Sequence, residues 1–133
     1  MRYETTTLEQ ALKEVKWITL VIHETSGMSQ IITGEDARLK HSKVDVMIAY
    51  DNDIPVAWGW SYTYNYNLEV RRRGFQFFVQ PDYRRQGIGS QLFAWGLEEA
   101  QKRHLKLKVY PWDDKGQCFF DKHKVSDKNR GWW

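Results

Sequence analysis

The chain has 133 residues, a formal net charge of +3 and one cysteine, Cys118. This length suits a single domain over residues 1–133 whose core needs no metal, and one cysteine excludes an intrachain disulfide. No apolar run approaches the roughly 18 residues that span a membrane, and the N-terminus has no signal-peptide core. We therefore expect a cytoplasmic protein without membrane contact. The net charge gives nucleic-acid binding little support, although the positive charges are clustered.

The N-terminal third is predicted to contain a strand, a helix and a loop. MRYETT (1–6) is the strand, and Thr7 is a typical helix N-cap because Gln10 stands at the capping-box position. Apolar residues at helical spacing extend the predicted helix to about Thr25. These residues are Leu8, Leu12, Val15, Ile18 and Ile22. Residues 26–42 have mixed polarity, which predicts a loop that could hold a short helix.

The middle of the chain is predicted to form strands. KVDVMIAY (43–50) is a strand and DNDIP (51–55) a turn, followed by a strand over residues 56–67. In this last strand every second residue is Trp or Tyr, which gives it one aromatic face. The residues of this face are Trp58, Trp60, Tyr62, Tyr64 and Tyr66. FQFFV (75–79) is a further strand.

The last third is predicted to form a helix over 87–104, a strand over 105–112 and a short helix over 115–124. Consecutive strands joined by short turns should pair antiparallel, whereas the strand–helix–strand unit should pair in parallel through a right-handed crossover. The expected fold is therefore α/β (α+β), with a mixed, mostly antiparallel sheet and helices on both faces.

The segment QPDYRRQGIGSQL (80–92) lies between a predicted strand and a predicted helix. The first N–H groups of a helix lack internal partners, and the helix dipole adds positive charge there. Gly87 and Gly89 would let a ligand approach the backbone, and Arg84 and Arg85 add forked donors. The turn suits a phosphate, against the alternative of a capping turn with solvated arginines. Its spacing fits neither a Walker loop nor the G-x-G-x-x-G fingerprint of dinucleotide-binding folds.

The pattern from Arg84 to Gly89, R-x-x-G-x-G, resembles the [QR]-x-x-G-x-[GA] loop of the GNAT superfamily of N-acetyltransferases. The longer stretch FFVQPDYRRQGIGSQLFAW resembles the strand, proline, loop and helix of that family. The predicted order of elements also matches, up to about Val125. The resemblance implies a GNAT-like fold and transfer of an acetyl group from acetyl-CoA to an amine.

The resemblance also implies roles for individual residues. The loop would hold the pyrophosphate of acetyl-CoA, mostly through main-chain N–H groups. Its residues are Arg84, Arg85, Gln86, Gly87, Ile88, Gly89 and Ser90. Phe78 and Val79 would lie where two parallel strands separate and the pantetheine arm inserts, with the Val79 amide polarising the thioester carbonyl. No metal is expected.

The general acid of the family is not found at its usual place. The family pattern N-x-x-A-x-x-x-Y ends in a tyrosine that protonates the thiolate, and Phe120 stands at that position. Water could supply the proton, and the other candidates are Tyr110, Cys118 and His123. The alternatives are that Cys118 is a small buried hydrophobe and that His123 faces solvent or the end of its helix.

The sequence also does not identify the general base. Relatives place a glutamate on the strand before the loop, but RRRGFQFFV (71–79) contains no carboxylate. Glu69 and water are candidates, and Asp82 is better interpreted as a solvated turn residue. These departures leave open a second interpretation, in which the protein is a catalytically weak or inactive GNAT-fold protein that binds a macromolecular partner.

Two further groups of residues could bind the acceptor amine. The aromatic face is core by default, but Tyr64 and Tyr66 could line the acceptor site. Residues 71–73, three arginines, are expected at a solvated edge, although they could bind an acidic acceptor or the 3′-phosphate of coenzyme A. The acceptor amine stays unknown. VSDKNRGWW (125–133) is enough for one strand where the family usually has two, and a second copy of the chain could cover the edge, as in a homodimer.

Overall fold

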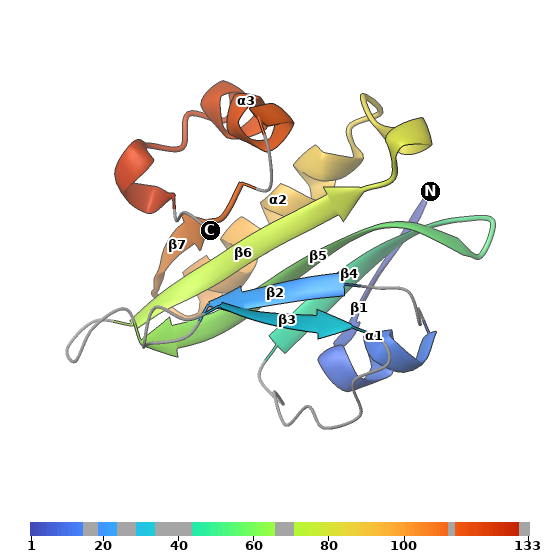
Figure 1. Ribbon diagram of the computed structural model, residues 1–133, viewed down its shortest axis with the longest axis horizontal. Helices are drawn as coiled ribbons and strands as arrows, with labels where there is room; N and C mark the ends of the chain where they lie inside the picture. Colours follow the sequence, from blue (N-terminus) through green and yellow to red (C-terminus); the bar gives the residue numbers. More distant parts are fainter. Residues whose placement is uncertain (15–18, 24–28, 34–43, 66–70, 112–113, 131–133) are drawn as a thin grey trace.

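The computed structural model shows a mixed α/β fold (Figure 1). It describes residues 1–14, 19–23, 29–33, 44–65, 71–111 and 114–130. The strands are β1 Arg2–Thr7, β2 Thr19–His23, β3 Ser29–Thr33, β4 Val44–Asp51, β5 Ile54–Asn65, β6 Arg71–Val79 and β7 Lys106–Val109. The helices are α1 Leu8–Glu14, α2 Ile88–Lys102 and α3 Asp114–Lys122, with 3₁₀ turns η1 Pro81–Tyr83 and η2 Asp127–Asn129. None of the helices described is long and apolar enough to cross a membrane.

The sheet has the predicted mixture of pairings. Five strands lie in the order β1-β4-β5-β6-β7, and every neighbouring pair is antiparallel except β6 and β7. After α3, the described residues contain no further strand, only η2 and one isolated parallel bridge between Val109 and Arg130. The prediction of a mixed, mostly antiparallel sheet is confirmed.

The predicted first helix is too long. The main-chain N–H of Gln10 donates to Thr7 Oγ1 at 3.2 Å, so the N-cap is as expected, but α1 ends at Glu14. Residues 19–23 form β2, which pairs antiparallel with β3 in the stretch expected to be a loop. The apolar run TLVIH is short and rich in β-branched residues, and periodicity cannot separate such a run from a helix. Val15 and Ile18 lie outside the described residues.

Helices cover both faces of the sheet, as predicted (Figure 1). On one face α1 packs against β4, and its residues Leu8 and Ala11 share a buried cluster with the aromatic residues of β5. These aromatic residues, Trp58, Trp60 and Tyr62, are at most 3% exposed. The aromatic face of β5 is therefore core as far as Tyr62. The β2–β3 hairpin crosses this same face in Figure 1. On the other face α2 and α3 pack against Phe75 and Phe77.

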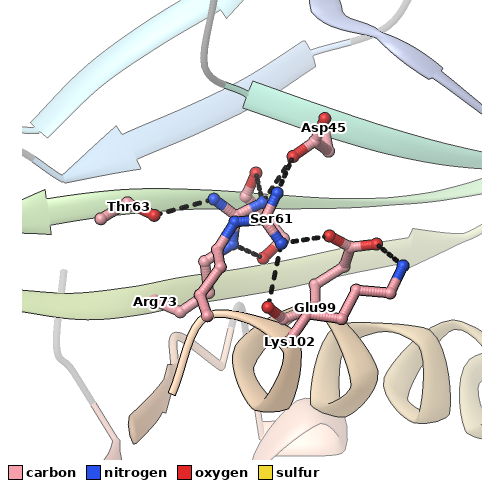
Figure 2. Close-up of polar contacts among 7 residues, drawn as sticks. Asp45, Ser61, Thr63, Arg73, Glu99 and Lys102 are labelled. Carbon is pink, nitrogen blue, oxygen red and sulfur yellow. Dashed lines mark hydrogen bonds and ion pairs between the residues drawn. The ribbon is translucent and has the colours of Figure 1, made fainter. Parts of the chain in front are cut away.

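The prediction that residues 71–73 lie at a solvated edge is wrong for Arg73, which is 1% exposed. Figure 2 shows its polar contacts. Its Nε donates to Ser61 Oγ at 2.7 Å, and its Nη1 donates to Thr63 Oγ1 at 2.9 Å. Its Nη2 bonds Asp45 Oδ2 at 2.7 Å. The small polar residues that alternate with the aromatics of β5 leave room for the guanidinium beneath α2, which explains its burial.

Asp45, a partner of Arg73, also binds the C-terminal end of α2. Arg103 bonds both Asp45 Oδ2, at 3.2 Å, and the Glu99 carboxylate, while Lys102 lies 3.4 Å from Glu99. Burial alone would raise the pKa of Glu99, but the hydrogen bond and charge of Arg103 outweigh it and lower that pKa. Asp45 therefore connects β4, β6 and α2.

Replacing Asp45 by Asn should leave the buried guanidinium of Arg73 without its charged partner. We expect the free energy of unfolding, measured by urea denaturation, to fall by about 1–3 kcal/mol, because the Asp45 side chain is 39% exposed and the loss is partly screened. The control is Asp53→Asn, since Asp53 pairs with Arg2 at 85% exposure and should change the midpoint little. Equal decreases in the free energy of unfolding for the two variants would contradict the role assigned to Asp45.

Candidate functional site

The turn between β6 and α2 presents unpaired main-chain N–H groups. Arg85 (φ 63°) and Gly87 (φ 80°) both adopt the left-handed conformation. Gly87 is the N-cap of α2, and no side chain of the described residues caps it. The first helical bond runs from Gln91 N to Gly87 O at 3.2 Å, so the N–H groups of residues 88–90 have no partner within the helix. Such a turn can bind an anion.

Gly87 and Gly89 are required for different structural reasons. A Cβ on Gly87 would meet nothing within 4 Å, but the positive φ favours glycine. A Cβ on Gly89 would lie 3.0 Å from Phe77 Cε2 and 3.3 Å from Phe119 Cε2. Gly89 therefore lets α2 approach the rings of β6 and α3, rather than opening space for a ligand as the sequence suggested.

The arginines of the turn also differ. Arg84 is half-buried, and its Nε donates to the Val79 carbonyl at 3.0 Å. Its guanidinium lies 5.9 Å from the centre of the Phe78 ring. Arg85 is exposed beside the helix N-terminus, together with Gln86. Arg84 thus fixes the turn onto the end of β6, whereas the side chain of Arg85 is accessible.

Tyr83 connects the turn to the sheet. Tyr83, in η1, donates its hydroxyl to Asp51 Oδ2 at 2.9 Å, and this bond raises the pKa of the phenol. Asp51 ends β4, so the η1 segment is fixed to the β4–β5 end of the sheet. The position of the glycine turn therefore depends on the sheet and not on the turn alone.

The parallel strands β6 and β7 separate beside this turn. Their pairing ends with Phe75 opposite Val109, and the last main-chain bond runs from Tyr110 N to Phe75 O at 3.2 Å. On the other edge of β6, Gln80 N donates to Val56 O. Because bonded and non-bonded pairs alternate in an antiparallel ladder, the N–H groups of Phe77 and Val79 point away from β5.

This open edge of β6 lies directly before the glycine turn (Figure 1). Beyond Tyr110, no main-chain bond joins β6 to the segment after β7 within the ranges that the structure describes. The N–H groups of Phe77 and Val79 are the main-chain donors of this edge. An extended ligand could therefore pair with β6 and place its anionic end at the N-terminus of α2.

Helix α3 forms the wall opposite the turn. The Phe119 ring lies 4.9 Å from Phe77, and His123 stacks on Phe119 at 4.1 Å. His123 Nδ1 lies 2.9 Å from the Phe119 carbonyl, which can only accept, so Nδ1 carries the hydrogen. His123 Nε2 then faces Ser90 Oγ at 3.4 Å. The expectation that His123 interacts with the end of its helix is confirmed, and it lies beside the glycine turn.

The candidates for proton transfer are scattered. Phe120 is 1% exposed and packs against Phe77 and Phe93, and Tyr110 is 6% exposed. Cys118 is exposed, so its prediction as a buried hydrophobe is wrong: it lies on the outer side of α3 while the two phenylalanines that follow turn inward.

The remaining candidates from the sequence are Glu69, Tyr64, Tyr66 and Asp82. Glu69 and Tyr66 lie outside the described residues, as does the side chain of Tyr64. Asp82 is exposed in η1, as expected for a turn residue. Among the described residues, no three His, Cys, Asp or Glu side chains gather as a metal site would require.

The sequence pattern did not indicate a role for Gln76. Gln76 is 1% exposed in β6, and its Nε2 donates to the Tyr110 carbonyl at 3.1 Å, where the strands separate. The available signal was a lone polar residue inside the apolar run FQFFV. Its significance depends on which strand lies beside β6, which the sequence alone does not give.

Solved structures with this fold include several acetyltransferases. A predicted acetyltransferase from Clostridium acetobutylicum, solved with acetyl-CoA, has a TM-score of 0.62 at 13% identity, covering 95% of this chain and 90% of its own. A ribosomal-protein-alanine N-acetyltransferase from Brucella melitensis biovar Abortus 2308 has a TM-score of 0.63 at 13% identity, covering 95% of this chain and 93% of its own.

A third similar structure is a transcriptional regulator from Bacillus halodurans C-125, with a TM-score of 0.58 at 22% identity. The match covers 69% of this chain and 65% of that protein, which is less than two thirds of its length. At these identities the three likenesses establish the fold alone. Among curated protein sequences, none matches this chain significantly.

The family comparison is more specific than the structural likenesses. The model of the acetyltransferase (GNAT) domain matches residues 42–123, which is more than half of the chain. The matched range contains the open edge of β6, the glycine turn, α2 and α3. With the fold and the turn described above, this match shows that the chain belongs to the GNAT acetyltransferase family.

Proposed function

We propose that the protein is an N-acetyltransferase that moves the acetyl group of acetyl-CoA to an amine. The observation that carries the proposal is the continuity of two features, the unpaired edge of β6 beyond Phe75 and the uncapped N-terminus of α2. An extended pantetheine arm needs main-chain donors along its length, and a pyrophosphate needs N–H groups at its end. Membership in the GNAT family supports the same ligand.

In this proposal each part of acetyl-CoA has its own contacts. The pyrophosphate binds the N–H groups at the start of α2, with Arg85, Gln86 and Ser90 around it. The pantetheine arm pairs with β6 at Phe77 and Val79. Arg84 does not need to touch the ligand, because its bond to the Val79 carbonyl already serves to hold the turn on the strand.

The chemical step is direct transfer. The amine nitrogen attacks the thioester carbon, the C–S bond breaks, and the thiolate of coenzyme A leaves. A main-chain N–H of the open β6 edge, that of Phe77 or of Val79, donates to the carbonyl oxygen as negative charge develops on it. The amine gives its proton to water or to Glu69, and the thiolate takes a proton from water or from Tyr110. No proton comes from Phe120, since a phenyl ring has none to give.

The acceptor is proposed only as a class, a primary amine on a small molecule or on a protein. Tyr64 and Tyr66 are the proposed side chains on the acceptor side. A second candidate function is a GNAT-fold protein with weak or no catalysis that binds a macromolecular partner. The phenylalanine at position 120 favours it, because a phenyl ring cannot act as the usual general acid. Phe120 packs instead among the rings of Phe77 and Phe93.

Substituting Gly87 tests the proposed pyrophosphate site. A side chain there meets no atom within 4 Å, and both Asp and Asn tolerate a positive φ. Gly87→Asp places a carboxylate beside the phosphates, whereas Gly87→Asn has the same shape without the charge. We expect calorimetric titration to show acetyl-CoA binding about tenfold or more weaker for Asp than for Asn. Equal affinities would place the pyrophosphate elsewhere.

Phe120→Tyr tests whether position 120 faces the leaving thiolate. Because the ring is 1% exposed, we expect the new hydroxyl to be buried and the rate of thiol release from acetyl-CoA, with a panel of amines, to change less than about twofold. A general acid contributes roughly 10²–10⁴ in rate, so a gain of roughly tenfold or more would overturn this placement. Tyr110→Phe is the companion variant, and it should slow release if Tyr110 is the acid.

A further inference from the structure

Gln76 is a polar side chain in an apolar part of the site. It lies in β6 between Phe75 and Phe77 and is 1% exposed. Its Nε2 donates to the Tyr110 carbonyl at 3.1 Å, and its Oε1 is buried without a partner among the described residues. An unpaired buried acceptor lowers stability, and an apolar side chain of the same size would avoid that loss. Stability alone therefore does not explain a glutamine here.

The bond from Gln76 replaces a bond of the sheet. In a regular parallel ladder, the pair Phe75–Val109 would be followed by a bond from the Phe77 N–H to the Tyr110 carbonyl. The Gln76 amide occupies that carbonyl instead, and the bond from Phe77 is absent from the described main-chain bonds. The Tyr110 carbonyl is satisfied although the two strands do not close.

We propose that Gln76 is a positioning residue that holds β6 and β7 apart, so that the Phe77 N–H stays available to the pantetheine arm of acetyl-CoA. This inference rests on the proposed function. The side chain acts by satisfying the carbonyl that would otherwise draw the strands together. It touches the main chain of Tyr110 and not the reacting atoms.

The variant Gln76→Met removes the donor and keeps the volume. The Tyr110 carbonyl is then left to the Phe77 N–H, and the ladder extends by one bond. We expect the urea midpoint to stay the same or rise, while the Kd for acetyl-CoA increases about tenfold or more because the open edge becomes a minor state. The matched control is Gln101→Met, the same change at an exposed position of α2, which should alter neither quantity.

A purely structural role predicts the opposite pattern. Gln76→Met would then lower the urea midpoint, and the folded protein would bind acetyl-CoA as the wild type does. An unchanged Kd for Gln76→Met would overturn the inference, and it would leave the proposed function intact because the wild type still binds.

Amide hydrogen exchange of the wild-type protein tests the inference without a variant. The Phe77 N–H should exchange faster than that of Phe75, which lies in the parallel ladder, and it should slow when acetyl-CoA is added. Equal protection of the two amides before acetyl-CoA is added would overturn the inference. If Phe77 exchanges fast and acetyl-CoA does not bind, the separation of the strands stands and the proposed function falls.

Discussion

The pairing of β6 with β7 ends after the pair Phe75–Val109, and the candidate site depends on that ending. Two parallel strands that stayed paired would consume the N–H groups of Phe77 and Val79 in the sheet. Their separation leaves these donors at an edge, immediately before a turn that leads into the uncapped start of α2. The end of the β6–β7 pairing thus provides main-chain donors for an extended ligand. The adjacent N-terminus of α2 provides donors for the anionic end of that ligand.

The two ends of β6 are stabilised in different ways. At its beginning, Arg73 is held by Ser61, Thr63 and Asp45, and Asp45 also bonds Arg103 at the end of α2. This network joins the sheet to α2 through polar bonds that are buried at Ser61 and more exposed at Arg103. At the other end, aromatic rings from β6, α2 and α3 pack together, and the main-chain edge of β6 on the β7 side is left unpaired. The strand is therefore held by side-chain polar bonds far from the glycine turn and has an unpaired edge where it approaches the turn.

The order of elements from β4 to α3 and the glycine turn were predictable from the sequence, because they depend on local periodicity and on residues close together in the chain. The β2–β3 hairpin was not, since the run TLVIH fits both a helix and a strand. The burial of Arg73 requires knowing that Ser61 lies opposite Phe75 in the register of β5 and β6. The role of Gln76 depends on Tyr110, 34 residues later, which only the fold brings beside it.

Titration of ¹⁵N-labelled protein with acetyl-CoA, followed by amide NMR, tests the central claim most directly. We predict saturable shifts at two sets of amides together: those of Phe77 and Val79 on the open edge, and those of residues 88–90 at the start of α2. Shifts at neither set while the spectrum stays that of a folded protein, or shifts confined to other surfaces, would contradict this claim.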